Sequence, residues 1–303
     1  MTDKPHCATA TPRPVIFGEV LFDRFPDGST VLGGAPFNVA WHLQAFGLQP
    51  LFVSAVGADP LGEQVRTAMQ DWGMDVSGLQ TSPDYPTGAV EVRFHDGEPH
   101  YTITPDSAWD FIRAEKLPPP PANALLYHGS LALRQPVSRH AWEQLAQQTG
   151  AAARFIDINL RAPWWDETLL TPWLQGARWL KINADELAAI VPQAGDAEGR
   201  IRSLFDTLPL EWLVITQGAA GAAAVSASGA RLQVRPEQAA QVVDTVGAGD
   251  SFSSVLLLGL AHGWPMEQTL QRAQQFAAAV VGLRGATTRQ RAFYQPFIDH
   301  WGL

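Results

Sequence analysis

One stretch near the C-terminal end constrains the fold and chemistry of this chain more than any other. It reads Asp-Thr-Val-Gly-Ala-Gly-Asp-Ser-Phe over residues 244–252 and leads directly into a long apolar run. Because Gly247 and Gly249 flank Ala248 just before a helical pattern, several backbone N–H groups can point into one concavity at the positive end of a helix. Asp250 follows this predicted anion site, where its carboxylate can accept a proton from a hydroxyl that attacks a phosphate. The stretch therefore predicts phosphoryl transfer.

Two other phosphate-binding motifs do not account for this stretch. A Walker A loop requires a lysine followed by serine or threonine after its glycines, and no such pair follows Gly249. A dinucleotide fingerprint requires a third glycine where Phe252 stands, and it belongs to an early strand-to-helix turn. The alternative that remains open is that Asp250 only caps a buried helix, which is a common use of aspartate.

Two motifs resemble the signatures of the ribokinase-like, or PfkB, family of sugar kinases. The string at 244–252 is similar to the C-terminal signature, and Gly-Gly-Ala-Pro-Phe-Asn-Val-Ala at 33–40 is similar to the N-terminal one. The two strings occur in the expected order, and segments between them also match, so the resemblance covers nearly the whole chain. It implies that Asp250 is the catalytic base and that the preceding Gly-Ala-Gly holds the transferring phosphate.

The composition argues against several classes of partner. A formal net charge of −9 without any basic run predicts that the chain binds neither nucleic acid nor a membrane surface. The single cysteine, Cys7, cannot form an internal disulfide and lies in a polar N-terminal segment without the apolar core of a signal peptide. The longest apolar run, 255–261, is too short to span a bilayer. We expect a cytoplasmic protein.

The order of the predicted elements indicates an α/β fold. Short apolar runs at 15–18, 51–57, 124–130 and 212–215 are typical of buried parallel strands, and helical patterns separate several of them. This alternation predicts a doubly wound, mainly parallel sheet with helices on both faces. The resemblance implies the ribokinase-like version of that fold, and we expect one domain over residues 1–303.

The segment from 87 to 104 departs from this rhythm. Its alternating apolar residues and the turn signal Asp96-Gly97 predict a hairpin. The resemblance implies that about 19–32 and 87–105 form a small, discontinuous β lid over the sugar, and relatives often dimerise through it. Trp109 either closes the far side of the sugar pocket or packs in the core.

Four residues match positions that contact the sugar in the family. Asp23 lies at the end of an apolar segment, and a solvent-facing strand end is its plain alternative. Gly33 and Gly34 allow a ligand to approach the backbone, because no Cβ intervenes. The Asn38 amide can donate and accept, which suits a polyol. The resemblance assigns all four to substrate binding.

A second group of polar residues follows later strands. Arg161 offers a planar fork suited to phosphate oxygens, and the resemblance assigns it to the phosphate or the substrate; an interdomain salt bridge is the alternative. Asn183 and Glu186 have the spacing of a capping box. They also match a family motif associated with Mg²⁺ and its waters, and the two roles are compatible.

The nucleotide and ion sites are implied by the resemblance. Thr216, Gly218 and Gly221 match a loop that contacts the ribose and phosphates of ATP, and Gly249 is expected to contact the phosphates as well. Some relatives also bind K⁺ near the positions of Asp244 and the loop at residue 285.

We therefore expect an ATP-dependent sugar kinase, and strings such as Phe-Gly-Glu-Val at 17–20 most resemble bacterial fructokinases. Kinases for ribose, 2-keto-3-deoxygluconate or a nucleoside are alternatives of the same class. A catalytically silent sugar sensor is a different-class alternative, although the intact Asp250 argues against it. A nicotinamide-dependent enzyme is disfavoured because the glycine fingerprint is missing.

Overall fold

A computed structural model describes residues 11–95, 98–150, 153–236 and 242–303 of the chain. Within these residues the main sheet has nine strands in the order β13-β12-β11-β10-β9-β8-β1-β4-β5, and only β12 and β13 pair antiparallel to their neighbours. The strands are β1 (Arg13–Phe17), β4 (Leu51–Gly57), β5 (Leu79–Ser82), β8 (Ala124–His128), β9 (Ala153–Asp157), β10 (Trp179–Asn183), β11 (Trp212–Thr216), β12 (Ala222–Ser226) and β13 (Arg231–Val234).

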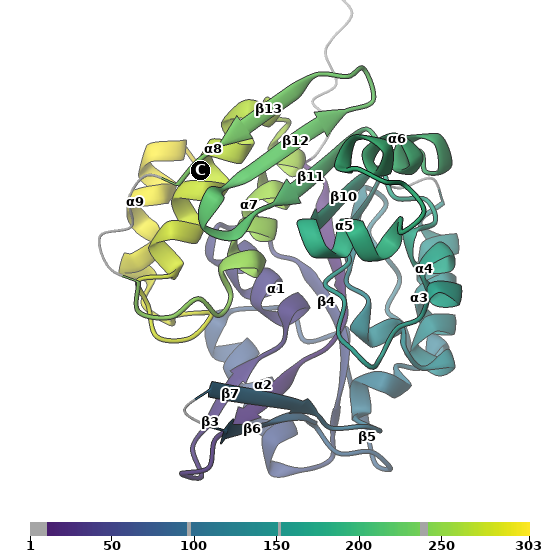
Figure 1. Ribbon diagram of the computed structural model, residues 1–303. Helices are drawn as coiled ribbons and strands as arrows, with labels where there is room; N and C mark the ends of the chain where they lie inside the picture. The colour runs from purple at the N-terminus through teal and green to yellow at the C-terminus, as the bar shows by residue number, and fades with distance from the viewer. Residues whose placement is uncertain (1–10, 96–97, 151–152, 237–241) are drawn as a thin grey trace, which may run out of the picture.

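Helices cover both faces of this sheet, as Figure 1 shows with α7 to α9 on one side and α3 to α6 on the other. The helices are α1 (Ala35–Ala45), α2 (Pro60–Trp72), α3 (Pro136–Gln148), α4 (Glu167–Leu174), α5 (Ala184–Ile190), α6 (Ala197–Thr207), α7 (Ala248–His262), α8 (Met266–Val280) and α9 (Arg291–Trp301). Short 3₁₀ turns occur at Ala108–Phe111, Ala114–Lys116, Leu131–Leu133 and Gly218–Ala220.

The continuous apolar strands follow from this two-sided coverage. Successive side chains of a strand point to opposite faces. In β1, Ile16 therefore packs in the core with α1, α2 and α7 to α9, whereas Val15 and Phe17 pack in the core with α3 to α6. Every residue of β4 is buried. The predicted doubly wound α/β fold is confirmed.

A separate small sheet lies at one end of the main sheet. Its strands β2 (Leu21–Arg24), β3 (Thr30–Gly33), β6 (Gly88–His95) and β7 (Glu98–Ile103) are ordered β3-β2-β6-β7. In Figure 1 these strands lie below the helical layers. The turn signal at 96–97 and Cys7 lie outside the described residues.

Two features of the fold depend on single residues. Helix α3 begins at Pro136, because the missing N–H of proline costs nothing in the first turn of a helix. Trp109 is fully buried in the core, and Arg134 stacks on its ring at 4.4 Å. Core packing is therefore the role that the structure gives Trp109.

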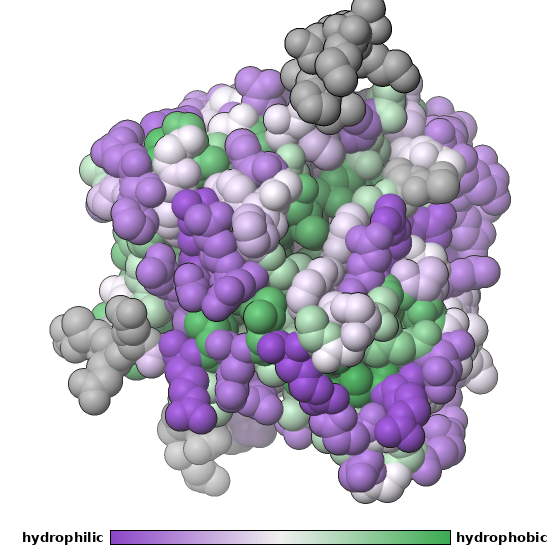
Figure 2. All heavy atoms as spheres, turned by 90° about the horizontal axis from the view of Figure 1, so that it is seen from above, coloured by the Kyte–Doolittle hydropathy of each residue, from purple (hydrophilic) through white to green (hydrophobic). Residues whose placement is uncertain are grey.

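One face of the molecule is mainly polar (Figure 2). Figure 2 shows the face seen from above Figure 1, where hydrophilic side chains predominate and apolar ones gather mostly in hollows between them. Among the described residues, no helix combines the length and the apolar character needed to cross a bilayer.

Candidate active site

A cavity of about 1180 Å³ lies between the small sheet and the carboxyl ends of the parallel strands. Its wall combines the segments that follow β1, β8 and β9 with the loop before α7, the start of α1 and parts of the small sheet. Ligands of open α/β sheets bind in the crevice outside the carboxyl ends of the strands, where the loops that follow the strands can contact them.

The glycine-rich stretch forms the start of α7, as predicted. Gly247 is the N-cap, with φ of +80°, and a Cβ there would lie 2.3 Å from the Cβ of Ala286. Only glycine combines that conformation with so close an approach. The first-turn N–H groups of a helix have no intrahelical acceptor, so this end of α7 presents donors and positive potential to the cavity. Gly247, Gly249 and Asp250 all line the cavity.

Asp250 lies in the first turn of α7 and reaches a neighbour far away in sequence. The Nδ2 of Asn38 donates to its Oδ2 at 2.8 Å, across 212 residues. Burial raises the pKa of Asp250 to about 6, although the Asn38 hydrogen bond lowers it; the nearby Asp157 raises it further. A carboxylate whose pKa lies this close to neutrality suits general base catalysis.

The predicted sugar-binding residues lie around the same cavity. Asp23, Gly33, Gly34 and Asn38 all line it. Burial raises the pKa of Asp23 to about 6, and the charge of Asp244 contributes. Gly34 has φ of +108°, and a Cβ there would lie 2.7 Å from the carbonyl oxygen of Glu19. This glycine is therefore required by the turn between β3 and α1 itself.

The floor of the cavity contains residues to which sequence reasoning assigned no role. Glu19, Tyr127, Asp157 and Lys181 all line it, from positions in or directly after β1, β8, β9 and β10. The Nζ of Lys181 donates to the Oδ2 of Asp157 at 2.8 Å, and Ser253 Oγ donates to the same oxygen at 2.6 Å. These residues could have been predicted from the sequence as polar residues at strand ends, because the carboxyl ends of parallel strands meet at one edge of the sheet.

Arg161 lines the cavity and is exposed. Its Nη1 donates to the neighbouring carbonyl of Leu160 at 3.0 Å, which leaves most of the guanidinium free for an anion. The loop that carries it is held by Trp164, whose ring stacks on Arg134 at 4.0 Å. Arg134 in turn makes a buried, bidentate ion pair with Asp110 at 2.7 Å.

Asn183 and Glu186 form the predicted capping box at the start of α5. Asn183 Oδ1 accepts from the Glu186 N–H at 2.8 Å, and the Glu186 oxygens accept from the N–H groups of Asn183 and Leu160 at 2.8 and 2.9 Å. Burial raises the pKa of Glu186. Neither residue lines the cavity. In the described part of the chain, no three His, Cys, Asp or Glu side chains are grouped to hold a metal ion.

The predicted nucleotide residues lie further along the same sheet edge. Thr216 ends β11 and pairs with Asn183 at the end of β10. Gly218 and Gly221 have φ of +57° and +99°, and a Cβ at Gly221 would lie 2.0 Å from the carbonyl oxygen of Val234. None of these residues lines the cavity. The strand order therefore places the predicted sugar and nucleotide groups side by side along one edge.

Asp244, near which K⁺ is expected to bind, is hydrogen-bonded to the loop that contains Gly285. Asp244 accepts from the N–H of Gly285 through Oδ2 and from the N–H of Val246 through Oδ1, each at 3.0 Å. Asp244 and Gly285 both line the cavity. The carboxylate therefore joins the loop before α7 to the loop after α8.

Comparison with known proteins agrees with this geometry. The family model described as "pfkB family carbohydrate kinase" matches residues 12–292. This chain is a pfkB-family carbohydrate kinase. The resemblance recognised from the sequence motifs is confirmed.

Relatives of this kinase include enzymes with named substrates. A fructokinase of Salmonella typhimurium is 32% identical over 295 residues, which cover 90% of this chain and 94% of the relative. The structure of a Xylella fastidiosa fructokinase with bound ATP matches with a TM-score of 0.85 at 22% identity, covering 97% of this chain and 100% of that one. An aminoimidazole riboside kinase of Salmonella enterica, solved with its riboside and an ATP analogue, matches with a TM-score of 0.79 at 26% identity, covering 91% and 95%.

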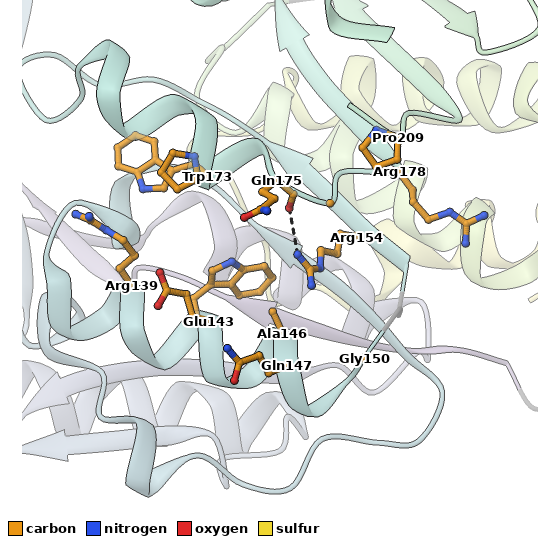
Figure 3. A pocket seen from close by; sticks show the side chains of 13 residues that line it. Arg139, Glu143, Ala146, Gln147, Gly150, Arg154, Trp173, Gln175, Arg178 and Pro209 are labelled. Atoms are coloured by element: carbon orange, nitrogen blue, oxygen red, sulfur yellow. Dashed lines mark hydrogen bonds between the residues drawn. The ribbon is translucent and has the colours of Figure 1, made fainter. Parts of the chain in front are cut away.

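The kinase has a second cavity, of about 570 Å³, at the opposite end of the sheet (Figure 3). Arg154 in β9 and Arg178 directly before β10 line it, so it opens at the amino ends of these strands. Arg154 Nη1 donates to the Gln175 carbonyl at 3.1 Å, as the dashed line in Figure 3 shows. Arg178 pairs with Glu211. Among the described residues no glycine-rich helix start borders this cavity, in contrast to the one beside Asp250.

Proposed function

We propose that this carbohydrate kinase is a fructokinase that transfers the γ-phosphate of ATP to a hydroxyl of fructose. The observation that carries the proposal is Asp250, a base with raised pKa at the positive end of α7, on the wall of a cavity of about 1180 Å³ that can hold a sugar together with phosphate groups. The fructokinase relative, 32% identical over 90% of the chain, supports fructose as the acceptor. The riboside kinase at 26% identity makes a riboside the acceptor to test beside it.

In the proposed reaction, Asp250 accepts the proton of the attacking hydroxyl. The sugar oxygen then forms a bond to the γ-phosphorus as the bond from that phosphorus to the bridging oxygen breaks, and ADP leaves with the electron pair. The N–H groups of Gly247, Ala248 and Gly249 stabilise the charge on the transferring phosphoryl group, and the exposed Arg161, which lines the same cavity, adds a positive charge. Asp23, Gly33, Gly34 and Asn38 orient the sugar.

The nucleotide is proposed to lie along the neighbouring strand ends, with Asn183, Thr216, Gly218 and Gly221 contacting it and Gly249 reaching its phosphates. The residues present fit a magnesium ion that is held mainly by phosphates and water. Glu186 would meet such an ion through water, since both of its oxygens already accept backbone N–H groups. When bound, Mg²⁺ neutralises charge on the phosphates.

Several accessory features are part of the same proposal. The small sheet acts as a lid, in agreement with Tyr101 and Ile103 lining the cavity from β7. Its outer strands β3 and β7 are open edges through which two copies can dimerise. Asp244 and the loop at Gly285 are the proposed K⁺ position. A cytoplasmic location is part of the same proposal, since ATP is available there.

The test is ADP release from Mg·ATP with a panel of fructose, ribose, glucose, mannose, 2-keto-3-deoxygluconate and aminoimidazole riboside. We expect fructose to give the highest kcat/KM. A higher value with any other acceptor would contradict fructose while leaving the carbohydrate kinase class intact. ATP binding without turnover of any acceptor, in a panel widened to nucleosides and sugar phosphates, would instead indicate a silent sensor.

A further inference from the structure

Glu19 is a buried acid of the cavity that the proposed mechanism leaves without a role. It follows β1, an interior strand that is third from the β5 edge of the main sheet, is only 5% exposed and lines the cavity. Its Oε2 has no hydrogen-bond partner among the described residues. Burial raises the pKa of Glu19 to about 7; its own backbone N–H lowers it, the charge of Asp250 raises it, and Arg161 and Arg134 lower it.

Neither cation near Glu19 donates a hydrogen bond to it among the described residues. Arg134 is bound by Asp110 through two hydrogen bonds of 2.7 Å and donates to the Thr104 carbonyl at 3.1 Å, while its buried Nη1 has no hydrogen-bond partner among the described residues. Arg161 is exposed and donates to the Leu160 carbonyl. A buried carboxylate oxygen without a donor destabilises the fold. Such a group is retained where a ligand supplies the missing donor, because functional sites tolerate a loss of stability.

The position of Glu19 indicates which ligand group supplies that donor. Asp250 has the helix N-terminus and the Asn38 amide beside it, which suits it to the hydroxyl that is phosphorylated. Glu19 lines the same cavity. It lies in the short connection between β1 and β2, and β2 carries Asp23. A molecule with several hydroxyl groups can therefore meet more than one acceptor of this cavity at once.

We propose that Glu19 accepts a hydrogen bond from a sugar hydroxyl other than the one that is phosphorylated. This bond would hold the reacting hydroxyl beside the carboxylate of Asp250. Glu19 is in this view a substrate-binding residue that sets which polyols fit. The inference rests on the sugar-kinase activity. It does not depend on fructose, because it concerns whichever sugar the enzyme phosphorylates best.

The test is Glu19→Gln, assayed with the sugar of highest kcat/KM in the acceptor panel. We expect the KM for the sugar to rise by about tenfold, because the amide oxygen of Gln is a neutral and therefore weaker acceptor than a carboxylate. The KM for ATP should stay unchanged and kcat should fall by less than about threefold. The matched control is Glu63→Gln, the same chemical change at an exposed position on α2.

Monodeoxy analogues of that sugar distinguish a substrate-binding role of Glu19 from a structural role. On the analogue that lacks the hydroxyl contacted by Glu19, wild type and Glu19→Gln should have equal kcat/KM, whereas the other analogues keep the difference. The melting temperature of Glu19→Gln should stay close to that of wild type, because Gln keeps the size of the side chain and no hydrogen bond from a described residue to Oε2 is lost.

Three results would overturn the inference: a wild-type sugar KM in Glu19→Gln, an equal penalty on every deoxy analogue, or a lowered melting temperature with parallel losses in kcat and in the KM for ATP. The last would assign Glu19 a structural role. Failure of wild type to use fructose counts against the fructokinase proposal alone, since this test uses the sugar that wild type does phosphorylate.

Discussion

The two cavities lie at opposite ends of the same parallel sheet, yet they use their charged groups differently. At the amino ends of the strands, Arg139 donates to the Leu133 carbonyl, Arg154 to the Gln175 carbonyl, and Arg178 pairs with Glu211. At the carboxyl ends, Glu19 keeps an oxygen without a donor among the described residues. The paired charges stabilise the fold, whereas we propose that the sugar supplies the partner of Glu19.

The largest expected effect is at the carboxyl-end cavity. Asp250→Asn keeps the size of the side chain but cannot accept a proton, so kcat should fall by about 10²–10⁴-fold while the melting temperature is retained. ADP release and thermal melting measure the two quantities. Asp206→Asn, at an exposed position on α6, is the matched control and should behave as wild type. A wild-type kcat in Asp250→Asn would leave Asp250 only the role of a helix cap.

The next largest effect is expected from a glycine substitution at the N-terminal end of α7, but not from one at its C-terminal end. Gly247→Ala and Gly263→Ala both force alanine into a left-handed conformation, at φ of +80° and +67°, which costs about 1–2 kcal/mol of unfolding free energy. Only at Gly247 does the new Cβ collide with Ala286, whereas nothing lies within 4 Å at Gly263. We expect kcat/KM for ATP to fall by up to about a hundredfold in Gly247→Ala alone, because the anion site is displaced.

Denaturant unfolding and initial rates of both glycine variants check this prediction. Equal losses of kcat/KM in the two variants would show that helix stability, and not the geometry of the anion site, limits activity.

The third effect is a shift in pH dependence. The base must be ionised, and burial raises the pKa of Asp250 to about 6, so kcat/KM should fall as the pH drops through this value. Glu19, with a pKa of about 7, lies in the same cavity, and the apparent pKa belongs to the interacting groups. Asn38→Leu removes the hydrogen bond that lowers the pKa of Asp250, so the acid limb should move to higher pH.

A profile of kcat/KM between about pH 5 and 9 is the measurement for this variant. An acid limb at the wild-type position in Asn38→Leu would mean that another group controls it.

The smallest effect is expected at the amino-end cavity. Arg178 and Glu211 are 44% and 42% exposed, so Arg178→Gln should change the unfolding free energy by less than about 1 kcal/mol. We expect kcat to stay within about twofold of wild type, since surface changes away from a site have small effects. A large loss of kcat with normal stability would contradict the distinction between the two cavities.

The sequence by itself determined the α/β class, the start of α7 and the capping box at Asn183. These follow from local rules: buried strands are continuous apolar runs, glycines precede a helix that binds an anion, and Asn and Glu at this spacing satisfy N–H groups at a helix start. The family motifs added the roles of Asp250 and Asn38, whose contact at 2.8 Å the structure shows. Those roles, like the single domain, remain predictions.

Only the tertiary structure decided which polar groups share the cavity floor. Glu19 and Asp250 are brought together because α7 packs against β1, an interior strand of the sheet, and local sequence patterns do not specify such packing. Lys181, Asp157 and Ser253 form one network because β9, β10 and α7 meet there. The same packing keeps Glu186 on backbone N–H groups and away from the cavity. Contacts between distant segments depend on topology, whereas helix starts and strand interiors depend on neighbours in sequence.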